Sequence, residues 1–322
     1  MKMLKNMIDC VIRYYYFYDR QSRLLSMVKD TSFQKKRLLQ VGGKYLDLSV
    51  PKIAGILNVT PDSFYDGGKY FETNQLVKQV EKMLNEGADL IDVGAFSSRP
   101  GAVEIGEEEE YNRLSRALGA IRDKWPETII SVDTTRANLA GKVIENFQVN
   151  IINDISGGMA DPEMFDVIAA FHVPYIMMHM RGTPANMQLN TDYSDILSEI
   201  IEFFKRQIFA IREKGVNDII IDPGIGFSKT LEHNYQILHH LDIFQIFNLP
   251  ILIGVSRKSM IHKLLEISPN QALNGTTVLH TLALERSADI LRVHDVLEAK
   301  QTIRLFRKTH TEGENYALQH PD

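Results

Sequence analysis

The chain has 322 residues, 44% of them apolar and 24% charged, which is ordinary for a soluble globular protein. The 36 Lys and Arg residues against 41 Asp and Glu residues give a formal net charge of −5. This composition excludes a disordered chain, a collagen and a disulfide scaffold, and the apolar runs are too short to span a membrane.

The charge is unevenly distributed along the chain. Residues 1–40 carry nine Lys and Arg against three Asp and Glu, whereas residues 41–322 carry 27 against 38. The single cysteine, Cys10, lies in the basic start, so the rest of the chain has no catalytic Cys, Cys-based zinc site or disulfide. The acidic body also argues against nucleic-acid binding, which requires a basic face.

Residues 1–35 are predicted to be an N-terminal extension outside the catalytic domain. Asp9 and Arg13 interrupt the apolar run that a secretory signal needs. One interpretation is a basic, aromatic helix resting on a membrane surface. The other is an appended segment with little structure, and Met27 offers a later start. We expect a catalytic domain over 36–310 and a C-terminal tail over 311–322.

The first predicted element is a β-hairpin over 36–49, because the pair Gly42-Gly43 suits a two-residue turn. From residue 52 onward, short runs rich in Ile and Val alternate with amphipathic stretches. The runs do not alternate with polar residues, as expected for strands buried on both faces of a parallel sheet. The predicted strands cover 53–57, 90–93, 129–132, 151–152, 175–178, 219–221, 251–253 and 290–293. The predicted helices cover about 73–86, 107–124, 136–147, 162–171, 193–214, 230–241, 271–286 and 295–307.

Eight strand–helix units predict the fold. They span 256 residues, from 52 to 307, or 32 per unit. This favours a single-domain α/β protein with a (β/α)8 TIM barrel. A doubly wound sheet is the alternative, but no G-x-G-x-x-G follows the first strand and no Walker A loop occurs.

Polar side chains follow every predicted strand. In a (β/α)8 barrel the carboxyl ends of the strands meet at one rim, where active sites lie. Asp133 alone could equally cap the next helix. Lys258 and Arg292 cannot be N-caps, and a buried cation needs a partner. The whole set therefore favours a binding site at this rim.

The rim residues divide into two chemical groups. Carboxylates, an amide and an ammonium suit a flat heterocycle with several N–H donors and a carbonyl, as supplied by Asp133, Asn153, Asp222 and Lys258. Cations beside hydroxyl and amide groups suit a phosphate or diphosphate, as supplied by Asn58, Ser98, Arg99, Arg292 and His294. The amide oxygen of Asn58 could also ligate a Mg²⁺ ion that bridges phosphates.

Two further sequence features lie outside these two groups. His179 follows a strand without a neighbouring carboxylate in sequence, so its role stays open. The acidic run 107–110 lies in the first turn of a predicted helix, where the dipole favours acids, and we interpret it as a solvated face.

The strand-end motifs resemble the dihydropteroate synthase family of pterin-binding barrels. The resemblance covers the whole barrel and none of residues 1–50. It is carried by eight stretches in order, GILNVTPDSFYDGG (55–68), SSRPGA (97–102), SVDT (131–134), INDISGG (152–158), HMRGTPANMQ (179–188), DPGIGFSKT (222–230), GVSRKS (254–259) and LRVHDV (291–296).

The resemblance implies a transferase of folate biosynthesis that joins 4-aminobenzoate to (7,8-dihydropterin-6-yl)methyl diphosphate, giving 7,8-dihydropteroate and diphosphate. It assigns the heterocycle group to the pterin, with walls from Met178, Gly226 and Phe227. It assigns the anion group to the diphosphate and to Mg²⁺, with Asn58 as the metal ligand. The residues bordering the aminobenzoate would be Phe64, Pro100, Ser256 and Lys258. The catalytic residues would be Asp133, Lys258 and Arg292.

The resemblance also implies a cytoplasmic homodimer that works without nucleic acid or membrane. Two alternatives stay open, a methyltetrahydrofolate-dependent methyltransferase and a non-catalytic pterin-binding paralogue. The methyltransferase would not need Arg99, Arg292 and His294 around a diphosphate. The paralogue should have lost some of the residues Asn58, Arg99, Lys258 and Arg292, and all four are present. The chain departs from the family at Ser98, often Thr, at Ala95-Phe96, often Gly-Glu, and at Ser228, often Gly.

Overall fold

The computed structural model describes residues 35–59, 69–96 and 105–319. The predicted N-terminal extension and the predicted site residues Phe64, Ser98, Arg99 and Pro100 lie outside the described residues. From Lys36 onward the chain forms one compact unit.

The chain enters this unit through a two-stranded antiparallel hairpin, β1 (Leu38–Val41) and β2 (Lys44–Asp47). Gly42 and Gly43 connect them with φ angles of +55° and +80°. A two-residue hairpin turn of this kind needs left-handed backbone at both positions, which glycine adopts without strain. The predicted hairpin is confirmed.

Eight parallel strands form the sheet, in the order β8-β7-β6-β5-β4-β3-β10-β9. A β-bridge between Ile221 and Ile251 joins the two end strands and closes the ring. The predicted (β/α)8 barrel is therefore confirmed, and the doubly wound alternative is wrong. The strands are β3 (Lys52–Asn58), β4 (Leu90–Gly94), β5 (Ile130–Asp133), β6 (Ile151–Asp154), β7 (Tyr175–Met178), β8 (Ile219–Asp222), β9 (Leu252–Ile253) and β10 (Ile290–Val293).

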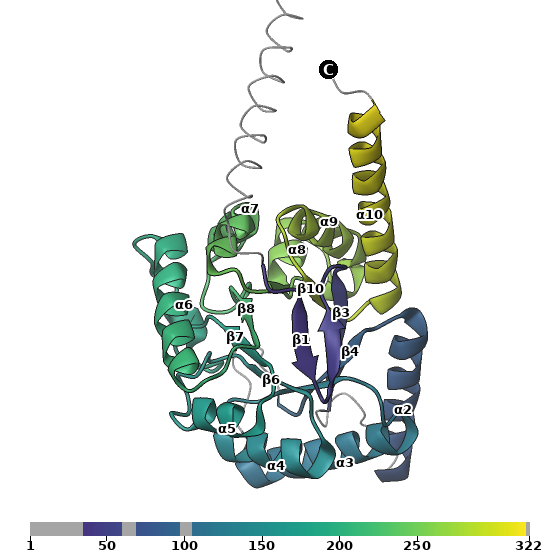
Figure 1. The fold of residues 1–322 in the computed structure, drawn as a ribbon, viewed down its shortest axis with the longest axis vertical. Helices are drawn as coiled ribbons and strands as arrows, with labels where there is room; N and C mark the ends of the chain where they lie inside the picture. Colours follow the sequence, from purple (N-terminus) through teal and green to yellow (C-terminus); the bar gives the residue numbers. More distant parts are fainter. Residues whose placement is uncertain (1–34, 60–68, 97–104, 320–322) are drawn as a thin grey trace, which may run out of the picture. The chain divides into compact units, whose positions relative to one another are not determined.

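Helices surround the sheet on its outside (Figure 1). Every predicted helical stretch contains a helix, and α10 continues past residue 307 to Gln319. The helices are α2 (Lys69–Glu86), α3 (Glu107–Lys124), α4 (Ala137–Phe147), α5 (Met164–Phe171), α6 (Ile196–Glu213), α7 (Leu231–His239), α8 (Ser259–Leu264), α9 (Leu273–Glu285) and α10 (Val296–Gln319). Short 3-10 turns occur at η2 (Met187–Leu189), η3 (Leu241–Phe247) and η4 (Pro269–Gln271). No helix in the described part of the chain has the length and apolar character needed to cross a membrane.

The strands are buried on both faces, and the inner face explains where the site lies. At the amino ends of the strands, inward residues such as Leu90, Ile151 and Ile220 pack against Leu39 and Val41 of the hairpin, which closes this end of the barrel. Two residues further along the strands, the inward layer turns polar. It contains Asp92, Asn153, Asp222 and Arg292, and here the barrel interior becomes a site instead of a core.

Candidate active site

The register of the sheet places three of the predicted residues on neighbouring strands. Asn58 of β3 pairs with Gly94, Gly94 with Asp133, and Asp133 with Asn153. Gly94 contributes no side chain, and a Cβ there would lie 3.6 Å from the Asp133 Cβ and 3.8 Å from Asn58 Oδ1. The glycine therefore keeps open the space between Asn58 and Asp133.

Asp133 ends β5 and does not cap the helix that follows. The N-cap residue of α4 is Arg136, whose own side chain makes no capping hydrogen bond. The alternative interpretation of Asp133 as a helix cap is therefore wrong. The first backbone N–H of α4, at Ala137, instead donates to Asp161 Oδ2 at 2.8 Å.

Arg292 of β10 joins two carboxylates on the inside of the barrel. Its Nε donates to Asp92 Oδ2 at 2.6 Å, and its Nη2 donates to Asp133 Oδ2 at 3.4 Å. Asn153 Nδ2 lies 3.3 and 3.4 Å from the two oxygens of Asp92. Although burial opposes its charge, the two carboxylates raise the pKa of Arg292. A fixed cation therefore stands beside Asp133.

Asp92 was not among the predicted site residues. It is 1% exposed and lies in the middle of an apolar strand, and its carboxylate organises both Arg292 and Asn153. A carboxylate inside a strand that is buried on both faces was the available signal, because a buried charge needs a partner.

The Asp133 carboxyl is set up to accept a ligand. Burial raises its pKa to about 7, with Arg292 opposing the shift and Asp92 adding to it. Its Oδ1 is buried and has no hydrogen-bond partner among the described residues. Because a buried acceptor without a partner is costly, this oxygen is suited to a donor or a positive charge brought by a ligand.

Asp222 and Lys258 form the second charged pair of the site. Asp222 Oδ1 accepts a hydrogen bond from the Gly224 N–H at 2.7 Å, and burial raises its pKa while Lys258 opposes the shift. The Lys258 Nζ donates to the Ile225 carbonyl and lies 4.6 Å from the centroid of the Phe227 ring. Burial lowers the pKa of Lys258 to about 8, against the effect of Asp222.

One side of the site is apolar. Met178 and Phe227, both predicted, belong to a buried cluster with Ile155, Met180 and Met187. Phe96 packs against this cluster, although its position is often Glu in the family. A wall of sulfur atoms and an aromatic ring suits a flat ring system.

Gly226, predicted as part of the pterin wall, lies close to Lys258. It has a φ of +86°, and a Cβ there would lie 3.0 Å from Lys258 Cδ. The bare backbone lets the lysine stem pass.

Ser256 and His294 lie together, although the sequence assigned them to different substrates. Ser256 Oγ accepts from the backbone N–H of His294 at 3.2 Å and lies 3.1 Å from His294 Nδ1. Beside them Arg257, at a left-handed φ of +56°, makes an ion pair with Asp295 through two nitrogens. These contacts fasten the loop after β9 to the loop after β10.

Two polar clusters near the site were not predicted. Glu110, in the acidic run 107–110, is only 3% exposed and accepts from Thr134 Oγ1 at 2.9 Å and Arg136 Nη1 at 3.0 Å. The solvated-face interpretation is therefore wrong for Glu110, because α3 turns this position toward β5. His179 follows β7 and is 3% exposed, with its Nδ1 3.1 Å from Lys229 Nζ.

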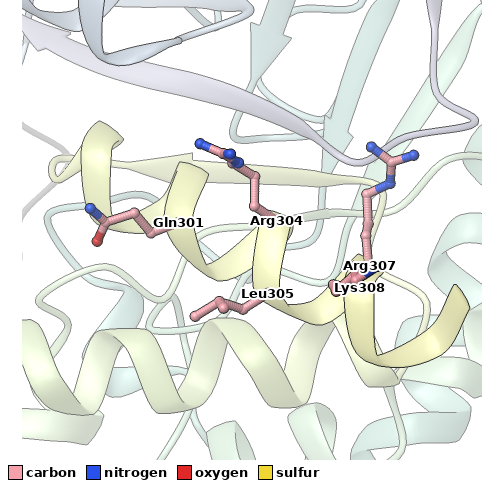
Figure 2. Close-up of a pocket in the computed structure, with 5 residues that line it drawn as sticks. All are labelled: Gln301, Arg304, Leu305, Arg307 and Lys308. Atoms are coloured by element: carbon pink, nitrogen blue, oxygen red, sulfur yellow. The ribbon is translucent and has the colours of Figure 1, made fainter. Parts of the chain in front are cut away.

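A separate pocket lies on the outside of the protein, along α10. Figure 2 shows its lining, which comes from this one helix: Gln301, Arg304, Leu305, Arg307 and Lys308. None of these residues follows a strand, so this pocket is no part of the site at the strand ends.

The residues that the structure describes contain no cluster of three or more His, Asp or Glu side chains that could hold a metal ion. What they provide is a buried group of carboxylates, an amide, a lysine and an arginine at the strand ends, with a cluster of apolar side chains beside it. Such a group of side chains can bind a heterocycle edge and stabilise charge that develops next to it.

Comparison with known proteins identifies the class to which this fold and site belong. The family model described as "Pterin binding enzyme" matches residues 54–294, which include every strand of the barrel except the first two residues of β3. The class is therefore that of the pterin-binding barrels.

Individual relatives narrow this class. Dihydropteroate synthase of Escherichia coli K12 is 41% identical over 277 residues, covering 85% of this chain and 96% of the relative. The crystal structure of Yersinia pestis dihydropteroate synthase in a sulfonamide drug complex superposes with a TM-score of 0.79 at 39% identity, covering 85% of this chain and 99% of that one. The structure of the Xanthomonas albilineans dihydropteroate synthase with 4-aminobenzoic acid superposes with a TM-score of 0.79 at 33% identity, covering 85% of this chain and 98% of that one. The chain belongs to the dihydropteroate synthase family.

Proposed function

We propose that the site joins 4-aminobenzoate to (7,8-dihydropterin-6-yl)methyl diphosphate, releasing diphosphate. The observation that carries this proposal is the buried pairing of Arg292 with Asp92 and Asp133, with one Asp133 oxygen left without a partner among the described residues. The proposed reaction develops positive charge on the pterin fragment and negative charge on the diphosphate. The carboxylate of Asp133 would stabilise the first charge, and the neighbouring cation of Arg292 would stabilise the second.

The pterin would lie in the deeper half of the site. The carboxylate of Asp222 can accept two parallel hydrogen bonds from an amino-pyrimidinone edge, while Asn153 and Lys258 meet the remaining ring nitrogen and carbonyl oxygen. Met178 and Phe227 supply the flat wall, and Gly226 leaves room for the lysine stem.

The diphosphate would lie at the rim, between Asn58, Arg292 and His294. Asn58 and His294 are exposed at the ends of β3 and β10. Arg292 can present guanidinium N–H groups to phosphate oxygens. Ser98 and Arg99, proposed for the same subsite, lie outside the described residues.

The described residues fit a Mg²⁺ ion that arrives with the diphosphate. Such an ion keeps most of its water and phosphate ligands and needs only one or two protein oxygens. The Asn58 Oδ1 lies beside Gly94 at the exposed end of β3 and would be one such ligand. When bound, the ion would neutralise charge growing on the leaving diphosphate.

The aminobenzoate would approach along Ser256 and Lys258, on the side of the site formed by the loop after β9. Phe64 and Pro100, proposed for the same subsite, are outside the described residues. Lys258 would therefore touch both substrates, with its ammonium near the pterin ring and its stem facing the aminobenzoate.

In the proposed mechanism, the bond from the pterin methylene to the diphosphate oxygen breaks with its electron pair leaving on the diphosphate. The Asp133 carboxylate stabilises the cation delocalised over the pterin, and Arg292 and His294 stabilise the leaving group. The aminobenzoate nitrogen then bonds to the methylene and releases one proton to solvent. No covalent enzyme intermediate is needed, in agreement with the lack of a thiol in the barrel.

The experiment that tests this function is the release of diphosphate by the purified protein with the pterin diphosphate, Mg²⁺ and 4-aminobenzoate. We expect release that depends on aminobenzoate and is lost in Arg292→Met. Absence of that dependence in the wild type would overturn the proposal. Pterin binding without release would favour the non-catalytic paralogue, and methyl transfer from methyltetrahydrofolate would favour the methyltransferase.

We also propose that the protein is a homodimer that uses α9 and α10. These neighbouring helices expose large apolar side chains, with Val278, Leu282, Leu297 and Leu305 each between 43% and 70% exposed. Exposed apolar patches of this kind are typical of interfaces. Light scattering of the wild type should give a molecular mass twice that of the chain. The double variant Leu282→Glu with Leu305→Glu should give the mass of a single chain. A monomeric wild type would contradict the proposal. The cytoplasmic location remains a prediction.

A further inference from the structure

A buried lysine outside the proposed substrate contacts lies behind the pterin half of the site. Lys229 is 4% exposed. Its Nζ donates to the Phe227 carbonyl at 2.9 Å and to the His179 carbonyl at 3.2 Å, and it lies 3.1 Å from His179 Nδ1. A lysine ammonium has three N–H donors, so these three acceptors satisfy it.

The contact with His179 defines the state of that imidazole. Burial, Lys229 and Arg181 all lower the pKa of His179 well below its usual value, so the ring is neutral. Its Nδ1 then accepts from the ammonium, which leaves the proton on Nε2. When Lys229 is protonated, the pair carries one positive charge, on its ammonium.

The loop after β8 is fastened at this point. Gly224, whose N–H holds the Asp222 carboxylate, has a φ of +71°. A Cβ on Gly224 would lie 2.0 Å from the His179 carbonyl oxygen and 3.2 Å from Lys229 Nζ. The ammonium is thus next to the peptide that orients Asp222. On the other side of the same loop, Lys258 donates to the Ile225 carbonyl.

We propose that Lys229 is a positioning residue of the pterin site, which fixes the loop after β8 onto the end of β7 and keeps Asp222 ionised from behind. It acts through Asp222 and does not touch the substrate. This inference rests on the proposed function, because it assigns the pterin to Asp222. The inference also assigns a role to His179, which the sequence left open: its Nδ1 accepts a hydrogen bond from the Lys229 ammonium.

The electrostatic effect of Lys229 on Asp222 depends on the other charges around that carboxylate. Lys258, Lys229 and Arg292 face its carboxylate, and each lowers a pKa that burial raises. Lys229 is itself faced by Asp222, Lys258, Arg181 and the neutral His179, and burial lowers its pKa well below the usual value. Removing Lys229 takes away one of three cations, so Asp222 should bind its proton at a higher pH.

The test measures binding of the pterin diphosphate with Mg²⁺ but without aminobenzoate, by calorimetry between pH 5 and 9. In Lys229→Met we expect Kd at pH 7 to rise about tenfold, and the pH below which binding is lost to move up by about one unit. In steady-state kinetics, kcat of this variant should change much less than its KM for the pterin diphosphate. Lys229→Arg keeps the charge and should keep the wild-type pH limit, even if it unfolds at a lower temperature.

Two further variants make the result decisive. Lys214→Met removes an exposed lysine paired with Asp166 and should change neither Kd nor the pH limit. Lys229→Gln keeps donor hydrogens for the two carbonyls but loses the charge, so it serves if the Met variant does not fold. A folded neutral variant whose Kd and pH limit match the wild type would overturn the inference, and so would a fall in thermal stability alone. A wild type that releases no diphosphate would instead overturn the proposed function.

Discussion

Asp92 shows how a single carboxylate can organise a site that it need not touch. Its two oxygens face Arg292 and Asn153, which both extend toward the rim. Asp133 then receives only a weaker contact, at 3.4 Å, from the same guanidinium. The stronger bond fixes the cation, and the weaker one leaves Asp133 available to a ligand.

We predict that Asp92→Asn lowers stability by about 3 kcal/mol, because it leaves a buried guanidinium without its main partner. Diphosphate release should fall by about 100-fold or more, since Arg292 loses its orientation. Thermal unfolding and steady-state kinetics measure the two effects. Asp166→Asn, a surface change, serves as the control, and an Asp92→Asn variant with wild-type activity would contradict the assignment.

A second prediction concerns pH. Asp133 acts as a carboxylate, so the active fraction rises as pH increases through its pKa of about 7. Lys258 acts as an ammonium, so the active fraction falls as pH increases through its pKa of about 8. A plot of kcat/KM against pH should therefore be a narrow bell with limbs near these values.

The Asp133→Asn variant is the matched control for this profile. Asn cannot titrate, so the acid limb assigned to Asp133 should disappear from whatever activity remains. An acid limb that persists unchanged in this variant would show that another group is responsible.

Among single residues, the sequence could predict the site residues that lie at strand ends. It could not predict those that a helix or a loop brings toward the site. Asp133, Asn153 and Asp222 each end or nearly end a strand, and the alternation of the barrel turns them inward. Glu110 and Lys229 are buried only because α3 and the loop after β8 pack where they do. Sequence spacing carries no information about that packing. The acidic run 107–110 was therefore interpreted as a solvent-exposed helix face, although Glu110 is buried.

At the scale of elements, the strands were predictable because they are buried on both faces and so read as continuous apolar runs. The six-residue helix α8 was missed because it is too short to show a helical period. The loops depend on backbone geometry that residue type only hints at. Ser228, where the family often has Gly, adopts a φ of +48°. Its hydroxyl compensates by accepting from the Arg181 N–H at 2.9 Å and donating to the Phe227 carbonyl at 2.8 Å.

The loop after β8 supports a third prediction. Gly224→Ala should destabilise the protein by about 2–4 kcal/mol and abolish pterin binding, because the added Cβ meets a backbone oxygen and the backbone is left-handed. Gly215→Ala is the matched control, since Gly215 has a φ of +87° but no atom within 4 Å of its Cβ position. It should cost only about 1 kcal/mol and leave binding intact. Chemical denaturation and calorimetry compare the two variants, and equal effects would show that the crowding at His179 is unimportant.

At the scale of the whole molecule, we predict that a chain starting at residue 36 folds and keeps its kcat/KM. Lys36 is tied into the barrel unit, since its N–H donates to the Asn248 carbonyl at 3.1 Å and its Nζ pairs with Asp218 at 2.6 Å. The hairpin that closes the barrel follows directly. Truncation tolerance depends on such contacts more than on position in the chain. A folded but inactive truncated protein would assign residues 1–35 a part in catalysis.

The closure of the barrel has a consequence for how the site moves. β9 is only two residues long, and the bridge to β8 is a single one, from Ile221 to Ile251, the residue just before β9. A junction with so few hydrogen bonds is where a closed sheet opens most easily. Asp222 directly follows one side of this junction, and the loop to Lys258 leaves the other.

We expect that local opening there separates Asp222 from Lys258 without unfolding the barrel, so that the seam acts as a hinge of the proposed pterin site. In hydrogen–deuterium exchange we expect the backbone amides of Ile221 and Leu252, which face this junction, to exchange faster than those of β4 and β5. Bound pterin should slow this exchange by bridging the two edges. Equal exchange around the ring would mean that the pocket keeps one fixed width.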